Sequence, residues 1–241
     1  MPIETIVSAV PALATILADR ATDLARAAVA DGRCFVVALP GGSVAEAFFP
    51  TLALARIDWD RVECFWGDER SVPPDDPQSN YRLAAQLLFK HVNVDPGRVH
   101  RMPADAVDLD AAAAAYEVAL RTILGPSPRF DMVLLGAGPD GHVCSLFPGH
   151  PALDESSRLV VAVTDSPKPP PRRLTLTFPA LAGASLLVVA AFGDEKSAVI
   201  REALENPDSG LPVARVARLS RQTLFLLDAE AAGFTHLSSV R

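Results

Sequence analysis

Residues 132–142 read MVLLGAGPDGH, an apolar run that passes directly into a glycine-rich polar loop. The same pattern occurs twice earlier, where the runs at 34–39 (CFVVAL) and 62–66 (VECFW) lead into PGGS and GDER. Alanine-rich helical segments separate these runs. Short apolar strands that alternate with helices are typical of a mostly parallel sheet covered by helices on both faces. The sequence therefore predicts an α/β fold.

The same alternation continues to the end of the chain. Further strands are expected at 159–163, 173–178, 185–191 and 223–227. Helices are expected at 11–30, 44–55, from about 79, at 108–124, 194–205 and 212–218. No linker or repeat interrupts the pattern, and 241 residues is near the upper limit for one hydrophobic core. We therefore expect a single domain over residues 1–241.

Composition excludes several classes of protein. There are 22 Lys and Arg against 29 Asp and Glu, a formal charge of −7 that argues against a globally basic nucleic-acid binder. With 49% apolar residues the chain can build a core, and no run approaches the ~18 apolar residues of a membrane span. The N-terminus lacks the basic region of a signal peptide, so a cytoplasmic protein is expected. Cys34, Cys64 and Cys144 suit neither a disulfide framework nor a CxxC metal site, and we expect reduced, mostly buried thiols.

Ligands of parallel α/β sheets bind beyond the carboxyl ends of the strands. Four polar loops are expected at that edge: 40–43, 67–80, 136–149 and 166–173. Lys196, in or just before the first turn of a helix, is expected beside them. Only three lysines occur in the chain, so this position is slightly more informative than a lysine usually is.

The first loop, Pro40-Gly41-Gly42-Ser43, lies between a strand and a helix. Free backbone N–H groups, a positive helix end and a hydroxyl would suit a phosphate or carboxylate. The alternative is a tight turn with Ser43 as the helix N-cap. A serine-hydrolase elbow is disfavoured because G-x-S-x-G would need glycine at Ala45.

The third loop matches the dinucleotide fingerprint G-x-G-x-x-G at 136–141. The fingerprint requires a long helix after the third glycine, and Pro148 and Pro151 interrupt the chain too soon. The loop instead presents Asp140 and His142, a plausible acid/base pair because a carboxylate can orient an imidazole. His150 is a lesser candidate for lining a site. His91 and His100 have no polar cluster around them, and His236 lies in the C-terminal tail. All three are expected to be structural or solvated.

Two further loops carry charge. Asp68-Glu69-Arg70 could be a solvated turn, but its place at a strand end before a Pro-Pro loop favours a functional role. The segment 166–173, SPKPPPRR, could be a polyproline linker. Because a strand follows it directly, it is better interpreted as a loop that holds Lys168 and an arginine over the sheet edge.

Five runs in the same order closely resemble the 6-phosphogluconolactonase family: PGGSVAEAF, FWGDERSVPPDDPQSNY, FDMVLLGAGPDGHVCSLFPGH, SPKPPPRRLTLT and GDEK. The resemblance covers the chain from about Pro40 to Ala232. It implies a Rossmann-like α/β sandwich and hydrolysis of 6-phospho-D-glucono-1,5-lactone in the pentose phosphate pathway. It also implies a small sugar-phosphate substrate, neither metal nor nucleotide cofactor, no nucleic-acid or membrane partner, and a monomer or small homo-oligomer.

The resemblance also assigns roles to single residues. It makes His142 the general base, with Asp68 and Asp140 shaping the polar site. The phosphate contacts that it implies are Gly41, Gly42, Ser43, Arg70, Arg173 and Lys196. Cys144, where a smaller residue is expected, and Leu-Phe-Leu at 224–226, where tryptophan is common, depart from the family's pattern.

Two alternatives remain beside the lactonase. Glucosamine-6-phosphate deaminase shares the DGH motif but carries a glutamate in the segment after it, where this chain has Ser145-Leu-Phe-Pro148. A non-catalytic sugar-phosphate sensor would need a DNA-binding module, for which the acidic chain has no spare segment.

Overall fold

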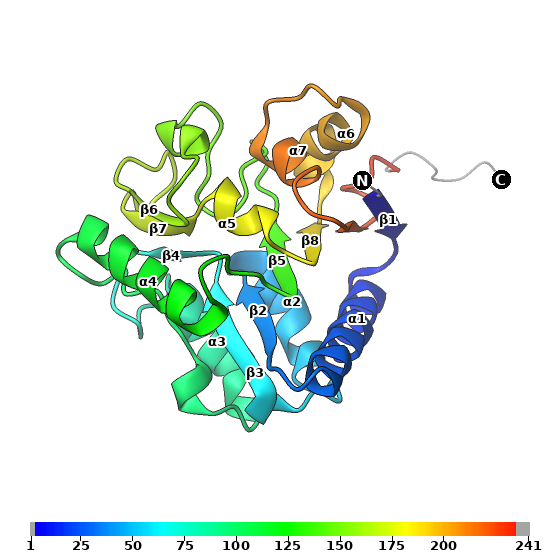
Figure 1. Ribbon diagram of the computed structural model, residues 1–241. Coiled ribbons are helices and arrows are strands. Elements are labelled where there is room, and N and C mark those ends of the chain that lie inside the picture. The colour runs from blue at the N-terminus through cyan, green and yellow to red at the C-terminus, as the bar shows by residue number, and fades with distance from the viewer. Residues whose placement is uncertain (1–2, 235–241) are drawn as a thin grey trace.

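The computed structural model describes residues 3–234 and contains a six-stranded sheet in which every neighbouring pair of strands is parallel (Figure 1). The strand order is β1-β9-β8-β5-β2-β3. The strands are β1 (Ile3–Val7), β2 (Phe35–Leu39), β3 (Val62–Trp66), β5 (Met132–Gly136), β8 (Leu186–Ala191) and β9 (Thr223–Leu227). The expected mostly parallel α/β fold is confirmed.

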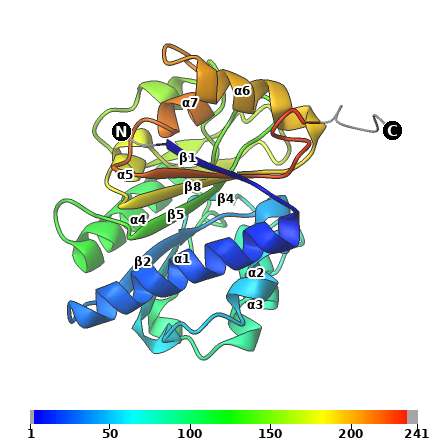
Figure 2. The same cartoon turned by 90° about the vertical axis from the view of Figure 1, so that its right-hand side faces the viewer.

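Helices cover both faces of this sheet. Figure 2 shows α1 and α2 on one face and α6 and α7 on the other. The helices are α1 (Val10–Ala30), α2 (Gly42–Leu52), α3 (Asn80–Leu87), α4 (Leu109–Leu124), α5 (Phe178–Ala182), α6 (Ser197–Glu205) and α7 (Pro212–Val216). Short 3-10 turns lie at Trp59–Arg61, Phe89–His91, Pro96–Arg98, Pro151–Asp154 and Asp194–Lys196. Within residues 3–234, no helix combines the length and apolar character that crossing a bilayer requires.

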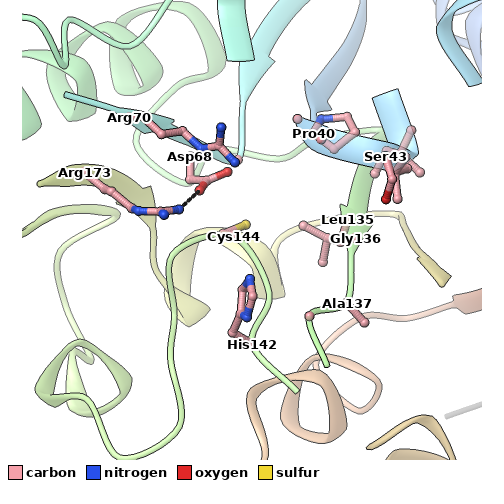
Figure 3. A pocket seen from close by; sticks show the side chains of 16 residues that line it. Pro40, Ser43, Asp68, Arg70, Leu135, Gly136, Ala137, His142, Cys144 and Arg173 are labelled. Carbon is pink, nitrogen blue, oxygen red and sulfur yellow. Dashed lines mark ion pairs between the residues drawn. The ribbon is translucent and has the colours of Figure 1, made fainter. Parts of the chain in front are cut away.

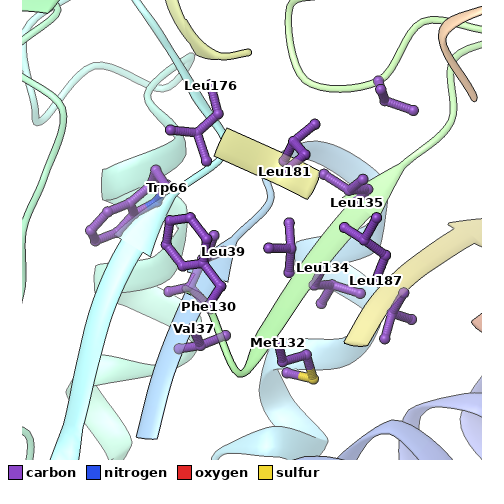
Figure 4. Packing of buried hydrophobic residues seen from close by; sticks show 14 of the residues in the cluster. Val37, Leu39, Trp66, Phe130, Met132, Leu134, Leu135, Leu176, Leu181 and Leu187 are labelled. Carbon is purple, nitrogen blue, oxygen red and sulfur yellow. The ribbon is translucent and has the colours of Figure 1, made fainter. Parts of the chain in front are cut away.

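The apolar runs form the centre of the core. Every residue of β2 and β3 is buried, which explains why these strands are apolar throughout, apart from Glu63, rather than alternating. Leu39, Trp66 and Leu134 belong to one cluster of buried apolar side chains on neighbouring strands (Figure 4). Truncating a leucine in such a core typically costs about 2–5 kcal/mol.

A second, antiparallel sheet has the order β4-β7-β6 and was not expected. It consists of β4 (Asp68–Arg70), β7 (Arg173–Leu176) and β6 (Val160–Val163). The charged residues 68–70, expected in a loop, form a strand because β7 pairs with them over a long separation in sequence. The register places Asp68 opposite Thr175 and Arg70 opposite Arg173. This pairing brings the charges of two loops together.

Two more strands differ from the sequence prediction. The edge strand β1 is only partly buried, so it shows no apolar run. The strand expected at 173–178 ends at Leu176, because Pro179 lies in the first turn of α5.

The chain changes direction across the sheet between β2 and β5. These strands are neighbours, but the chain continues from β2 to β3 on one side and from β5 to β8 and β9 on the other. Such a switch point opens a crevice at the carboxyl ends of the two strands, where ligands of open α/β sheets bind.

Candidate active site

A pocket occupies that crevice and brings together residues from all four expected loops (Figure 3). Helix α2, strands β4, β5 and β7 and the loop after β5 contribute to its walls. The lining residues are Pro40–Val44, Gly67, Asp68, Arg70, Leu134–Gly138, His142, Cys144 and Arg173.

One wall is the N-terminus of α2. Gly41 is the N-cap, Gly42 has a positive φ of 61°, and no side chain of the described residues caps the helix. The interpretation of Ser43 as the N-cap is therefore wrong: the helix begins at Gly42, and Ser43 lies in its first turn with an exposed side chain. The first N–H groups of a helix have no partner within it and carry its positive dipole end, so this wall can bind an anion.

Asn80 fixes the distance between this wall and Asp68. Its amide nitrogen donates to the Asp68 carbonyl oxygen at 2.9 Å and to Asp68 Oδ1 at 3.2 Å. A Cβ on residue 41 would lie 1.7 Å from Asn80 Oδ1, so Gly41 is required for the approach. Ser145 Oγ donates to Asp68 Oδ2 at 2.6 Å and holds this carboxylate from the other side.

Glu69 holds the proline-rich loop rather than facing the pocket. Its carboxylate accepts hydrogen bonds from the backbone N–H groups of Arg70, Asn80 and Tyr81 at 2.7–2.9 Å and from Ser79 Oγ at 3.0 Å. Burial raises the pKa of Glu69 although these donors favour the charged form. It is therefore a buried anchor of the N-terminus of α3.

His142 faces the α2 wall with one ring nitrogen engaged. Nδ1 lies 2.5 Å from Asp140 Oδ1, which leaves Nε2 for the pocket. The ring packs on Phe147, with ring centroids 4.8 Å apart. A Cβ on Gly138 would lie 2.0 Å from the imidazole, so only glycine leaves room for the ring.

The surroundings of His142 favour its neutral form. Burial lowers the pKa of the imidazole, Asp140 opposes that effect, and the Lys168 ammonium lowers the pKa further. Burial alone would raise the pKa of Asp140, but the hydrogen bond from His142 and the charges of His142 and Lys168 lower it overall. The pair thus combines a charged carboxylate with a neutral imidazole, the state that a general base requires.

Two arginines supply positive charge to the pocket. Arg173 Nη1 lies 3.9 Å from Asp68 Oδ2, the ion pair drawn in Figure 3, and 3.4 Å from Ser145 Oγ. Its Nε and Nη2 donate to the carbonyl oxygens of residues 168–170, so the same guanidinium anchors the proline-rich loop. Arg70 donates to the Gln78 carbonyl oxygen at 2.8 Å and lines the pocket beside it.

Cys144 lines the pocket as a free thiol. Burial, and to a smaller extent the charge of Asp68, raises its pKa well above the usual value. Because the thiolate is the reactive form, this cysteine is a poor nucleophile.

Some expected residues lie outside the pocket lining. Lys196 ends the turn after β8, where its buried ammonium lies 4.0 Å from Glu195 Oε1. His150 pairs with Asp165 at 2.9 Å, away from the pocket. His100 also lies outside the pocket lining, and its Nε2 lies 2.7 Å from Glu63 Oε2, a carboxylate that the sequence pattern did not place beside it. His236 lies outside the described residues.

Sequence reasoning missed three contacts of the site. Lys168 Nζ lies 3.5 Å from His142 Nδ1, and Asn80 and Ser145 hold Asp68. The motifs SNY and SLFPG contain two of these residues, but only the folded chain shows what they touch.

The chain is similar to known proteins in sequence and in fold. Residues 9–225 match the family model described as glucosamine-6-phosphate isomerases/6-phosphogluconolactonase. The 6-phosphogluconolactonase of Mycobacterium tuberculosis is 42% identical over 215 residues, covering 86% of this chain and 87% of the relative. The solved 6-phosphogluconolactonase of Trypanosoma cruzi superposes with a TM-score of 0.86 at 28% identity, covering 99% and 98% of the two chains. A monomeric glucosamine-6-phosphate deaminase has the same fold, with a TM-score of 0.81 at 23% identity over 97% and 99% of the chains.

Proposed function

Because the chain belongs to the glucosamine-6-phosphate isomerase/6-phosphogluconolactonase family, we propose that its pocket hydrolyses 6-phospho-D-glucono-1,5-lactone to 6-phospho-D-gluconate, the second step of the oxidative pentose phosphate pathway. The observation that carries the proposal is the pairing of His142 with Asp140, across the pocket from the uncapped N-terminus of α2. The first group supplies a base, and the second supplies a site for a phosphate.

His142 acts as the general base in this mechanism. Nε2 takes a proton from water as the water oxygen attacks C1 of the lactone, and Asp140 stabilises the imidazolium through Nδ1–H. The tetrahedral intermediate then collapses with cleavage of the bond between C1 and the ring oxygen, which receives the proton from Nε2. A positioned base of this kind contributes about 10²–10⁴-fold to the rate. Donors that meet the developing oxyanion contribute a further ~10²–10³-fold each.

The phosphate is held by the helix end and by cations around it. The N–H groups after Gly41, with Gly42 and the Ser43 hydroxyl, form the cradle. Arg70 and Arg173 line the same pocket. Lys196 lies in the turn after β8, outside the pocket lining, and is proposed as a further phosphate contact on the family resemblance alone. Charge-assisted hydrogen bonds are about twice as strong as neutral ones, so a dianion is favoured over a neutral hydroxyl.

Deaminase activity is the second candidate, and the residues after His142 argue against it. Deamination with isomerisation needs one base to move the C2 proton and an acid to open the sugar ring. Asp68 could provide one carboxyl group. After His142, the next acid is Asp154, which lies in the turn Pro151–Asp154 outside the pocket lining.

A negative charge introduced at Ser43 tests the phosphate cradle. Ser43→Asp should raise KM for the phosphorylated lactone by about tenfold or more, because a carboxylate there replaces a charge-assisted contact by a repulsive one. The helix itself tolerates Asp in its first turn. The control is Ser43→Asn, which adds similar bulk without charge, and the readout is KM for phosphorylated against unphosphorylated gluconolactone. An equal rise in KM for both substrates would show that Ser43 does not contact the phosphate.

A further inference from the structure

Lys168 lies beside the catalytic pair without lining the pocket. Its Nζ is 3.4 Å from Asp140 Oδ1 and 3.5 Å from His142 Nδ1. The ammonium thus lies on the Nδ1 side of the imidazole, opposite Nε2. Lys168 is not among the residues that line the pocket. The ammonium is therefore placed to act on the histidine rather than on a substrate.

The backbone of Lys168 is fixed by its own loop. Ser166 Oγ accepts a hydrogen bond from the Lys168 N–H at 3.2 Å and donates to the Lys168 carbonyl oxygen at 2.8 Å. Arg173 Nη2 donates to the same carbonyl oxygen at 3.0 Å. Because Ser166 and Arg173 are buried, this lysine starts from a rigid position, unlike a lysine on an exposed helix. The fixed backbone therefore places the Lys168 ammonium beside Asp140.

We propose that Lys168 is a positioning residue that shares the Asp140 carboxylate with His142, so that its ammonium opposes formation of the imidazolium and keeps Nε2 free to accept a proton. The inference rests on the proposed function of His142 as the base. Asp140 alone would orient the ring but would also favour its protonation. The neighbouring cation retains the orientation and limits the protonation.

The sign of the effect follows from the charges that face His142. In the described chain these are Asp140 of its own loop, Lys168 of the loop between β6 and β7, and Asp68 of β4. The two carboxylates raise the pKa of the imidazole, whereas burial and Lys168 lower it. Removing the ammonium leaves burial alone to oppose the two carboxylates, so the pKa of His142 should rise. The imidazole would then stay protonated up to a higher pH and could not act as a base below it.

The test compares Lys168→Met with Lys168→Arg, which keeps the charge. The acid limb of kcat/KM between pH 5 and 7.5 should move upward by roughly one unit in Lys168→Met, since two charges 3.5 Å apart interact by at least that much near a protein surface. Activity on the alkaline plateau should change little, and Lys168→Arg should retain the wild-type profile. A uniform loss at all pH values, or a higher KM with an unmoved limb, would overturn the proposal.

A second readout does not depend on catalysis. The titration of the His142 ring, followed by nitrogen NMR without substrate and identified by its loss in His142→Gln, should have a higher midpoint in Lys168→Met. If the midpoint moves but no lactone is hydrolysed, the charge coupling stands and the proposed function fails. If the lactone is hydrolysed but the midpoint does not move, the role of Lys168 fails.

Discussion

Two histidine–carboxylate pairs lie at opposite ends of the sheet, one at His142 and Asp140 and the other at His100 and Glu63. Each ring packs on a phenylalanine: His142 on Phe147 at 4.8 Å and His100 on Phe65 at 4.6 Å between centroids. Their surroundings differ. Glu63 also pairs with Arg98, whereas His142 faces a pocket closed on its other side by the N-terminus of α2.

The difference shows which surroundings make a histidine–carboxylate pair a candidate for catalysis. At the amino end of the sheet, both oxygens of Glu63 are engaged, and His100 does not line the pocket that Glu63 borders. At the carboxyl end, the pair leaves Nε2 free in a pocket that the N-terminus of α2, the proposed anion site, also lines. A histidine next to a carboxylate is therefore insufficient evidence of catalysis without such a space.

The largest difference is expected on removing each histidine. His142→Gln should lower kcat by about 10²–10⁴-fold with little change in KM, because the variant loses the proposed general base and keeps the proposed phosphate cradle. His100→Gln, the matched change in the other pair, should keep kcat near the wild-type value. The measurement is the steady-state rate of each variant with freshly generated lactone. Equal kcat values in the two variants would contradict a catalytic role for His142 alone.

Gly138→Ala should give the next largest loss. The new Cβ would lie 2.0 Å from the imidazole, and a flexible side chain yields before the backbone does. We expect His142 to be displaced and kcat to fall by about 10²-fold, within the range for loss of a positioned base. The control is Gly210→Ala, where a Cβ meets nothing within 4 Å. A variant with unchanged kcat and an unchanged melting temperature would contradict the tight fit of the ring.

The smallest effect on activity is expected at Glu63. Glu63→Gln removes the charge shared by Arg98 and His100 and leaves them with a weaker acceptor. The free energy of unfolding should fall by about 2 kcal/mol, since hydrogen bonds to charged groups contribute ~1.5–3 kcal/mol. For a chain of this size that lowers Tm by roughly 4–8 °C. Thermal unfolding measures the loss, and KM and kcat at 25 °C should not change; a change in either would link this cluster to the pocket.

Much of the fold could be predicted because its strands are buried on both faces. The apolar runs at 62–66 and 132–135 correspond to β3 and β5 almost residue for residue. Strands β1 and β4 could not be found in this way. β1 is a half-exposed edge, and β4 is a charged tripeptide that becomes a strand only through pairing with β7.

In the site, too, some features have a local sequence signal and others depend on contacts across the fold. Glycines and charges at strand ends indicated the four loops, and the family resemblance indicated roles for His142 and Asp68. The partners of these residues depend on contacts across the fold. Ser145 donates to Asp68 over 77 residues of sequence, and Lys168 reaches His142 over 26. No local sequence pattern predicts contacts between residues so far apart in the chain, because loop conformation and sheet register determine them.

The most direct test of the central claim is a product assay on the wild-type chain. Formation of 6-phosphogluconate from freshly generated lactone is followed with a coupled dehydrogenase, after subtraction of spontaneous hydrolysis, and ammonia release from glucosamine 6-phosphate is measured in parallel. The arrangement of His142, Asp140 and the α2 N-terminus predicts lactone hydrolysis far above the spontaneous rate and no detectable ammonia. Ammonia release at a comparable rate, or lactone loss no faster than in buffer, would contradict it.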